Sequence, residues 1–206
     1  MKLYLSSFKI GKKPQTLVNM LAWNYKVAYI NNGQAHSIID IQKFESLWDM
    51  RELREAGLSP EALNLRDYFG NAKWLKKKLE TFGLIYVGGG STYNLRLAMK
   101  LSGFDTVIHE LKNTDMVYAG FDAGANVVGP DLNAYKRIES HDHTTYGDNE
   151  TVYEGLGLTP WYFVGHVDSE HESSTSSSKM LMKYYDENSL KYRKVRDGEV
   201  ILHEVK

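Results

Sequence analysis

The sequence predicts an α/β protein, a three-layer α/β/α sandwich around a mostly parallel sheet. Short apolar runs alternate with segments of helical periodicity over about the first 130 residues, which is the pattern of a parallel sheet covered by helices on both faces. Small residues follow two of the apolar runs, at positions 88–90 and at 120 and 123–125. Because ligands bind beyond the carboxyl ends of the strands in such sheets, both segments are candidate parts of a functional site.

The 206 residues are enough for one domain with a sizeable core, and we expect a single domain over residues 1–206. Strands are expected at residues 2–6, 26–30, 62–68, 84–87 and 116–119, and helices at residues 14–22, 39–56, 71–81 and 91–101. The polar residues 131–152 predict an irregular loop. Beyond it we expect a strand at 161–164, a serine-rich turn at 173–178, a helix at 180–187 and a hairpin around Asp197 and Gly198.

The composition excludes several classes of function. A net charge of −1 gives no electrostatic case for binding nucleic acid or an anionic membrane. The absence of cysteine excludes disulfides, thiolate–zinc sites and a cysteine nucleophile, and it fits a reducing compartment. No run approaches the roughly 20 apolar residues that a membrane helix needs, and the N-terminal apolar run is too short for a signal peptide. We therefore expect a cytoplasmic protein.

Asp122 is the most informative single residue. The apolar run at 116–119 leads into Gly120, and Ala123 and Gly124 follow Asp122. Small residues on both sides of a polar one predict a sharp strand-to-helix turn that lifts the Asp122 side chain out of the sheet. In hydrolases built this way the central residue is a nucleophile, usually serine or cysteine.

The triple glycine at 88–90 admits more than one interpretation. Its backbone could approach a ligand closely, and the N–H of Gly89 or Gly90 could form an oxyanion hole together with the Ala123 N–H. The same segment could cradle a phosphate or form a plain tight turn. No Gly-Lys-Ser/Thr follows, which disfavours nucleotide binding.

His166 is a candidate general base because it follows an apolar strand and would reach the same crevice as Asp122. A lone histidine at such a place can equally be structural. Glu139 and Asp142, in the polar loop, are the candidate acidic residues that orient His166, although either could be a solvated charge.

The case for a metal site rests on composition alone. The oxygen and nitrogen ligands at hand are Asp122, His141, Asp142, His143, His166, Asp168 and His171. They show no fixed pair with the spacing of metal ligands on a helix. We therefore expect no metal.

Several segments resemble the peptidase E-like proteins, the serine peptidase family of dipeptidase E and cyanophycinase. The matching segments, in order, are Val87-Gly-Gly-Gly-Ser-Thr-Tyr93, Tyr118-Ala-Gly-Phe-Asp-Ala-Gly-Ala-Asn126, Gly155-Leu-Gly-Leu-Thr-Pro160, His166 and Asp197-Gly-Glu-Val-Ile201. The segment around Asp122 resembles the Gly-x-Ser-Ala-Gly-Ala-Asn nucleophile elbow of that family. The similarity spans nearly the whole chain.

The resemblance implies a fold akin to class I glutamine amidotransferase domains, which are flavodoxin-like, with a nucleophile elbow after a central strand. It implies cleavage of short peptides without cofactor or metal, in dipeptidase E those with an N-terminal aspartate. It assigns His166 as the base, Asp142 or else Glu139 as the acidic partner, and the N–H groups of Gly89 or Gly90 and of Ala123 as the oxyanion hole.

Asp122 and Gly165 depart from the pattern, since the family has serine at the first position and often proline at the second. A carboxylate gives up no proton to His166, and its attack on an amide would form a high-energy anhydride. Loss of a serine nucleophile typically costs on the order of 10⁶-fold in turnover.

Three functions remain open: peptidase E-type hydrolysis, binding of a short peptide or small molecule without catalysis, and hydrolysis with Asp122 itself as nucleophile. We expect a monomer or small homo-oligomer in each case.

Overall fold

The computed structural model describes residues 1–35, 39–139, 145–147 and 151–205. The strands are β1 (Lys2–Ser6), β2 (Lys26–Ile30), β3 (Ser59–Ala62), β4 (Leu84–Val87), β5 (Val117–Phe121), β6 (Tyr162–Val164), β7 (Tyr192–Lys194) and β8 (Val200–Glu204). The helices are α1 (Pro14–Met20), α2 (Ile39–Glu55), α3 (Ala72–Leu79), α4 (Thr92–Ser102), α5 (Phe104–Leu111), α6 (Ala123–Asn126) and α7 (Glu172–Glu187). Short 3₁₀ turns are η1 (Asn32–Gln34), η2 (Leu65–Tyr68) and η3 (Asn133–Arg137).

Within the described residues, the main sheet has the strand order β3-β2-β4-β5-β1-β8. All neighbours are parallel except β8, which runs antiparallel to β1 at one edge. The predicted α/β class is confirmed. Every residue of the central strands β4 and β5 is buried, as expected for strands covered on both faces.

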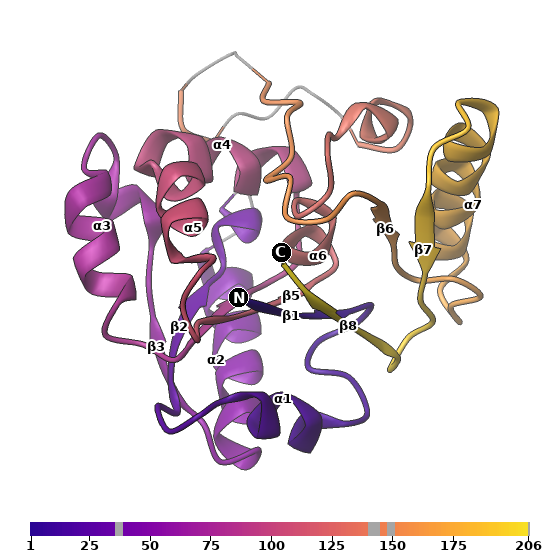
Figure 1. Ribbon diagram of the computed structural model, residues 1–206. Coiled ribbons are helices and arrows are strands. Elements are labelled where there is room, and N and C mark those ends of the chain that lie inside the picture. The colour runs from indigo at the N-terminus through magenta and orange to yellow at the C-terminus, as the bar shows by residue number, and fades with distance from the viewer. Residues whose placement is uncertain (36–38, 140–144, 148–150, 206) are drawn as a thin grey trace.

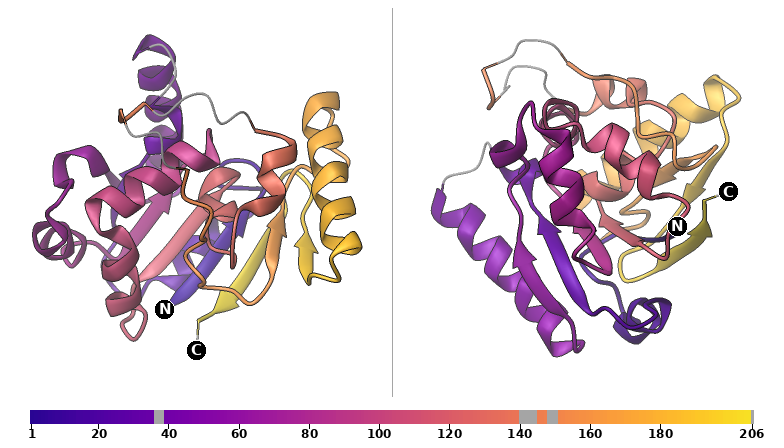
Figure 2. Two further views of the ribbon diagram at one scale, coloured as in Figure 1. Left: turned by 90° about the horizontal axis from the view of Figure 1, so that it is seen from above. Right: turned by 60° about the vertical axis from the view of Figure 1, so that its left-hand side comes forward.

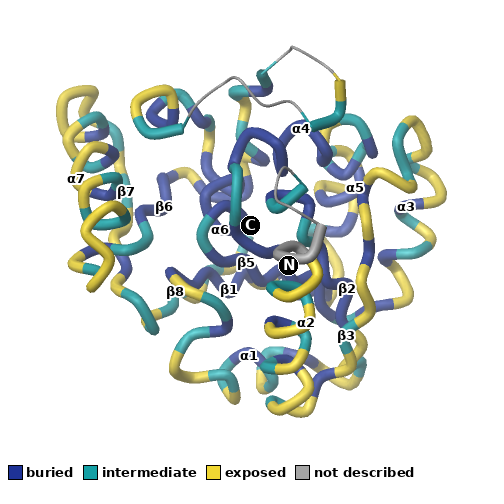
Figure 3. The backbone as a smooth tube through the Cα atoms, turned by 180° about the vertical axis from the view of Figure 1, so that it is seen from behind, coloured by how far each residue is buried: buried dark blue, intermediate teal, exposed yellow. Residues whose placement is uncertain are grey.

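Helices α3, α4, α5 and α6 lie on one side of the sheet and α1 and α2 on the other (Figure 1). Successive side chains of a strand point to opposite faces. Accordingly Ile85 belongs to the core under α4, whereas Tyr86 belongs to the core under α1 and α2. In Figure 3 the central strands are dark blue and exposed residues gather on the outer helices.

The prediction of a strand at residues 62–68 is wrong. The chain pairs with β2 earlier, over Ser59–Ala62, as an edge strand that tolerates Pro60. The Asn64 side chain then accepts a hydrogen bond from the Arg66 N–H at 3.0 Å and starts η2. An asparagine that bonds to the nearby backbone in this way competes with strand formation.

Two further predictions are wrong near the C-terminus. The serines at 173–178 lie inside α7 instead of in a turn. The strands on either side of Asp197 and Gly198 do not form a hairpin, because β7 pairs in parallel with β6 and β8 pairs with β1. The small β6–β7 sheet and α7 stand together beyond the β8 edge (Figure 2). Asp197 therefore lies in a link between two sheets.

The register of the main sheet brings three loops together. Val87 lies opposite Gly120, and Phe121 lies opposite Ser6. The segments that follow β4, β5 and β1 consequently start side by side at one edge of the sheet. In the described part of the chain, none of the helices is long and apolar enough to cross a membrane.

Candidate active site

Asp122 lies in a tight turn between β5 and α6. Its φ of 48° and ψ of −116° are uncommon for a residue with a side chain, and such backbone strain clusters at functional sites. The Asp122 carbonyl accepts hydrogen bonds from the N–H groups of Ala125 at 2.9 Å and Asn126 at 2.8 Å. The helix therefore begins immediately after Asp122, and the Ala123 N–H is one of the donors left without a partner inside the helix.

The small residues around Asp122 are required by close backbone contacts. A Cβ on Gly120 would lie 2.3 Å from the Gly124 carbonyl oxygen, and a Cβ on Gly124 would lie 2.3 Å from the Val87 carbonyl oxygen. The Tyr118 hydroxyl on β5 donates to the Gly124 carbonyl at 2.6 Å, which ties the turn to the strand that precedes it. The turn can therefore pack on β4 only when both positions are glycine.

We expect Gly124→Ala to lower the free energy of unfolding by about 2–3 kcal/mol, because backbone atoms must move to admit the methyl group. Gly129→Ala is the matched control, since its Cβ would meet its nearest neighbours at an ordinary 3.6 Å. Urea denaturation of both variants measures the difference. Equal stability of the two variants would contradict the close packing of the turn.

Asp122, His166 and Asp197 form a line of side chains. Asp197 Oδ1 is 2.8 Å from His166 Nδ1, and His166 Nε2 is 3.8 Å from Asp122 Oδ1. The Gly90 N–H donates to the other Asp122 oxygen, Oδ2, at 3.1 Å. The two oxygens of Asp122 therefore face different groups, a histidine on one side and a backbone donor on the other.

Asp197 is held by a closed set of hydrogen bonds. Its Oδ1 accepts from the Ser7 hydroxyl and its Oδ2 from the Ser169 hydroxyl, each at 2.7 Å. The Ser7 oxygen also accepts the His166 backbone N–H at 2.7 Å. Partial burial acts to raise the pKa of Asp197, but the hydrogen bonds from Ser7 and Ser169 and the proximity of His166 outweigh it and lower the pKa below its ordinary value.

An ionised Asp197 only accepts hydrogen bonds, so it fixes the proton of His166 on Nδ1 when the ring is neutral. Nε2, the nitrogen that faces Asp122, is then free to take a proton. The ring of Phe8 lies against His166 with centroids 6.3 Å apart and is 49% exposed, which gives the site an apolar wall.

The sequence model that describes peptidase family S51 matches residues 16–204 of this chain. The chain belongs to peptidase family S51. It is 34% identical over 92 residues to an uncharacterized peptidase of Listeria monocytogenes, covering 45% of this chain and 43% of that one. It is 30% identical over 118 residues to an uncharacterized peptidase of Listeria innocua, covering 57% and 54%. The match thus spans about half the length of these curated relatives.

Two crystal structures show the same fold. A candidate peptidase E protein from Listeria monocytogenes EGD-e superposes with a TM-score of 0.72 at 20% identity, covering 100% of this chain and 98% of that chain. A peptidase from an acI-B1 Actinobacterium gives a TM-score of 0.64 at 16% identity, covering 100% and 90%. The resemblance inferred from the motifs is thereby confirmed at the level of family and fold.

The sequence predicts Asp142 or Glu139 as the acidic partner in this S51 site, and the structure places a different residue, Asp197, against His166. Glu139 accepts hydrogen bonds from the Ser91 hydroxyl and from the N–H groups of Thr92 at 3.1 Å and Tyr93 at 3.3 Å. It caps the start of α4, where a carboxylate is favoured by the helix dipole. Asp142 lies outside the described residues.

The sequence does not indicate Asp197 as the partner of His166, because the resemblance implies an acidic residue between the elbow and His166. The only signals at Asp197 are its place in a segment that resembles the family and the Asp-Gly pair, which predicts a hairpin turn. Ser7 and Ser169 carry no sequence signal at all.

Among the described residues, no three side chains of the types that bind metals come together as a set of ligands. Of the candidate ligands in the sequence, His141, Asp142 and His143 lie outside the described part. The grouping of Asp122, His166 and Asp197 instead suits proton transfer and nucleophilic attack.

Proposed function

We propose that this S51-family protein is a hydrolase in which Asp122 is the nucleophile, His166 the general base and Asp197 the residue that orients His166. One observation carries the proposal: Asp122 Oδ2 accepts the Gly90 N–H while Oδ1 faces His166 Nε2. One oxygen can therefore attack a substrate, and the other lies where a backbone donor stabilises negative charge.

The proposed substrate has a leaving group on a saturated carbon, in a small molecule or a short peptide derivative. Attack of a carboxylate on an amide would give an anhydride, which is too high in energy to serve as an intermediate. Attack on a saturated carbon gives an ordinary ester, a stable covalent intermediate. Cleavage of peptide bonds in the manner of a serine peptidase is thus not the expected reaction of Asp122.

The reaction has two steps. Asp122 Oδ1 forms a bond to the substrate carbon, and the leaving group departs with the electron pair of the bond that breaks. His166 Nε2 then takes a proton from water, and the resulting hydroxide attacks Asp122 Cγ. Negative charge develops on Oδ2, which the Gly90 N–H already contacts. The Cγ–Oδ1 bond breaks, the alkoxide receives the proton from His166, and the Asp122 carboxyl group releases the second water proton to solvent. The alcohol carries the former Oδ1, and one carboxylate oxygen of Asp122 now comes from water.

Isotope labelling tests this proposal. After turnover of 1-bromobutane or styrene oxide in H₂¹⁸O, mass spectrometry of the peptide that contains Asp122 should show one ¹⁸O in its carboxylate. His166→Gln should stop the second step, so that the alkyl ester accumulates on Asp122. Turnover without label at Asp122, or label that enters equally in Asp122→Asn, would exclude Asp122 as nucleophile.

Binding of short peptides without catalysis is the second candidate, and one observation favours it. Asp122 and His166 are only 35% and 20% exposed, and they can pair with each other when His166 is protonated. A partly exposed carboxylate also suits the N-terminal amine of a peptide, for which an aspartyl dipeptide is the probe. Calorimetric binding of that dipeptide, lost in Asp122→Asn and accompanied by no hydrolysis, would favour this function.

We also propose a cytoplasmic location. The absence of cysteine from 206 residues supports a reducing compartment. Fractionation of cells that express a tagged chain would test it.

A further inference from the structure

A cavity opens beyond the carboxyl ends of β2 and β3, away from Asp122. It has a volume of about 640 Å³, within the range of sites for small molecules. The described residues that line it do not include Asp122, His166 or Gly90. The cavity is therefore distinct from the candidate active site.

One wall of this cavity is apolar. It is formed by Leu47 and Met50 of α2 together with Ala62 and Leu63 at the end of β3. Leu47 is 60% exposed, so its side chain is available to a ligand. A hydrocarbon body on the ligand would bury this surface, which is favourable by about 25 cal/mol per Å² of apolar area.

The charged side chains among the described residues of the lining are both basic. Lys43 of α2 and Arg66 of η2 line the cavity, and no described lining residue is acidic. The nearby carboxylates of Glu45 and Asp49 are paired with Lys9, at 3.4 Å and 2.7 Å. Within the described part of the chain, neither Lys43 nor Arg66 has an ion-pair partner. The cavity thus presents positive charge beside an apolar wall.

The polar side of the cavity is a network of hydrogen bonds around Asn32. Asn32 is 5% exposed, and its amide donates to Asn64 Oδ1 and to the Tyr146 hydroxyl, each at 2.9 Å. Its oxygen accepts the Leu65 N–H at 3.0 Å. Since Asn64 in turn accepts the Arg66 backbone N–H, this network fixes the backbone from which the Arg66 side chain extends.

The cavity also adjoins the backbone that positions Gly90. The Ser91 N–H donates to the Gly33 carbonyl at 2.9 Å, and the Gly88 N–H donates to the Ile30 carbonyl at 2.9 Å. A Cβ on Gly33 would lie 2.5 Å from the Gly89 carbonyl oxygen. Only one layer of main chain therefore separates the cavity from the glycines that face Asp122.

We propose that this cavity binds a small organic anion with an apolar body, whose anionic group contacts Lys43 and Arg66 and whose hydrocarbon part packs on Leu47, Met50 and Leu63. A ligand of this class contacts both the two cations and the apolar wall. A neutral lipid would leave the cations without an anionic partner, and a bare inorganic anion would leave the apolar wall exposed to water.

Two fluorescent probes of similar shape test the proposal. 8-Anilinonaphthalene-1-sulfonate carries an anionic group on an aromatic body, and N-phenyl-1-naphthylamine is its neutral counterpart. We expect the sulfonate to bind saturably at one site per chain and the neutral probe to bind at least 10-fold more weakly. Lys43→Gln and Arg66→Gln should each weaken binding of the sulfonate at least 5-fold and leave the neutral probe unaffected.

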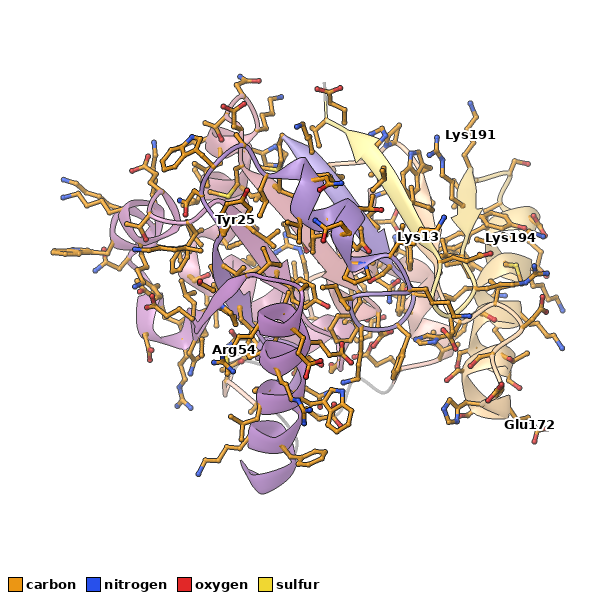
Figure 4. All side chains as sticks on the ribbon, turned by 90° about the horizontal axis from the view of Figure 1, so that it is seen from below. Lys13, Tyr25, Arg54, Glu172, Lys191 and Lys194 are labelled. Carbon is orange, nitrogen blue, oxygen red and sulfur yellow. The ribbon has the colours of Figure 1, made fainter. Side chains whose placement is uncertain are left out.

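Matched controls are Arg54→Gln, on the last turn of the same helix α2, and Lys194→Gln, on β7 at the far side of the molecule (Figure 4). Both should bind the sulfonate within 2-fold of wild type. Ala62→Phe should abolish binding by filling the apolar part. Each variant is first checked for an unchanged melting temperature. The proposal is overturned if the neutral probe binds as well as the sulfonate, if the controls lose as much affinity as Lys43→Gln and Arg66→Gln, or if Ala62→Phe binds normally.

Discussion

Asp122→Ser will react with a fluorophosphonate at least 100-fold faster than the wild-type protein and will carry a stable phosphonyl group on the new serine. The reason is that the groups a serine nucleophile would use lie around residue 122: Asp197 Oδ1 is 2.8 Å from His166 Nδ1, and the Gly90 N–H donates to the side chain of residue 122. General-base catalysis by a positioned histidine typically contributes about 10²–10⁴-fold. Intact-protein mass spectrometry with time measures the labelling rate.

The matched control for this experiment is the double variant Asp122→Ser with His166→Ala, which retains the serine but has no base. It should label no faster than wild type. The same Asp122→Ser protein should also hydrolyse an aspartyl anilide if the site accepts the substrates implied by the resemblance to dipeptidase E. A folded Asp122→Ser protein that stays inert toward both reagents would show that the differences from a serine peptidase extend beyond residue 122.

The outcome separates the functions considered above. If Asp122→Ser gains acyl-transfer chemistry while the wild type incorporates ¹⁸O at Asp122, then His166 and the Gly90 N–H can support either a serine or an aspartate nucleophile at residue 122. If Asp122→Ser gains this chemistry and the wild type takes up no label during turnover, binding without catalysis is favoured and the Asp122 proposal fails. These measurements use different reagents, so one can fail without the other.

Asp197→Asn will slow fluorophosphonate labelling of the Asp122→Ser protein on the order of 10³-fold. An asparagine amide can donate to Nδ1, so the neutral ring would carry its proton on Nε2, where it cannot take another from the nucleophile. The corresponding change in a serine protease triad costs about 10⁴-fold. The direct readout is ¹⁵N NMR of His166, in which the proton should move from Nδ1 to Nε2. An unchanged tautomer together with an unchanged rate would remove Asp197 from the site's chemistry.

Asp197→Asn should also change how the stability of the fold depends on pH. The pKa of Asp197 is lowered in the folded state. Its ionised form therefore stabilises the fold above the ordinary aspartate pKa of about 3.9, and this contribution is lost as the pH falls through the lower, folded value. Asp197→Asn should be less stable than wild type near neutral pH, and the difference should shrink on acidification. Urea denaturation at about pH 7 and about pH 3 measures both values, and a difference that grows in acid would contradict the assignment.

The local sequence was sufficient to predict the turn at Asp122 and the buried strands before it. Those predictions depend on short-range effects: apolar runs of strand length form β4 and β5, and only glycine fits where the turn packs on the Val87 carbonyl. The parallel α/β pattern then placed the ends of these strands at one edge of the sheet. The proximity of Gly90 and Asp122 could therefore be expected from the sequence, whereas His166 follows β6, which pairs with β7 in a separate sheet.

The partner of His166 could not be predicted in this way. Asp197 follows His166 by 31 residues, and Ser7, which contacts both, precedes His166 by 159. Their meeting depends on β7 joining β6 while β8 crosses over to pair with β1. Local periodicity predicts that a segment is a strand and says nothing about which strand it pairs with.

Residue type and spacing in the sequence thus determined the fold class, the family and the position of Asp122 as the unusual residue. The tertiary structure decided that Asp197 is the carboxylate in contact with His166, that Glu139 caps a helix instead, and that the oxygens of Asp122 face His166 and the Gly90 N–H. It also created the cavity beside β2 and β3, whose basic and apolar residues come from separate segments. The physical reason is the same in each case: a site formed by contacts between distant segments depends on how strands pair and pack, and that is settled only when the whole chain is folded.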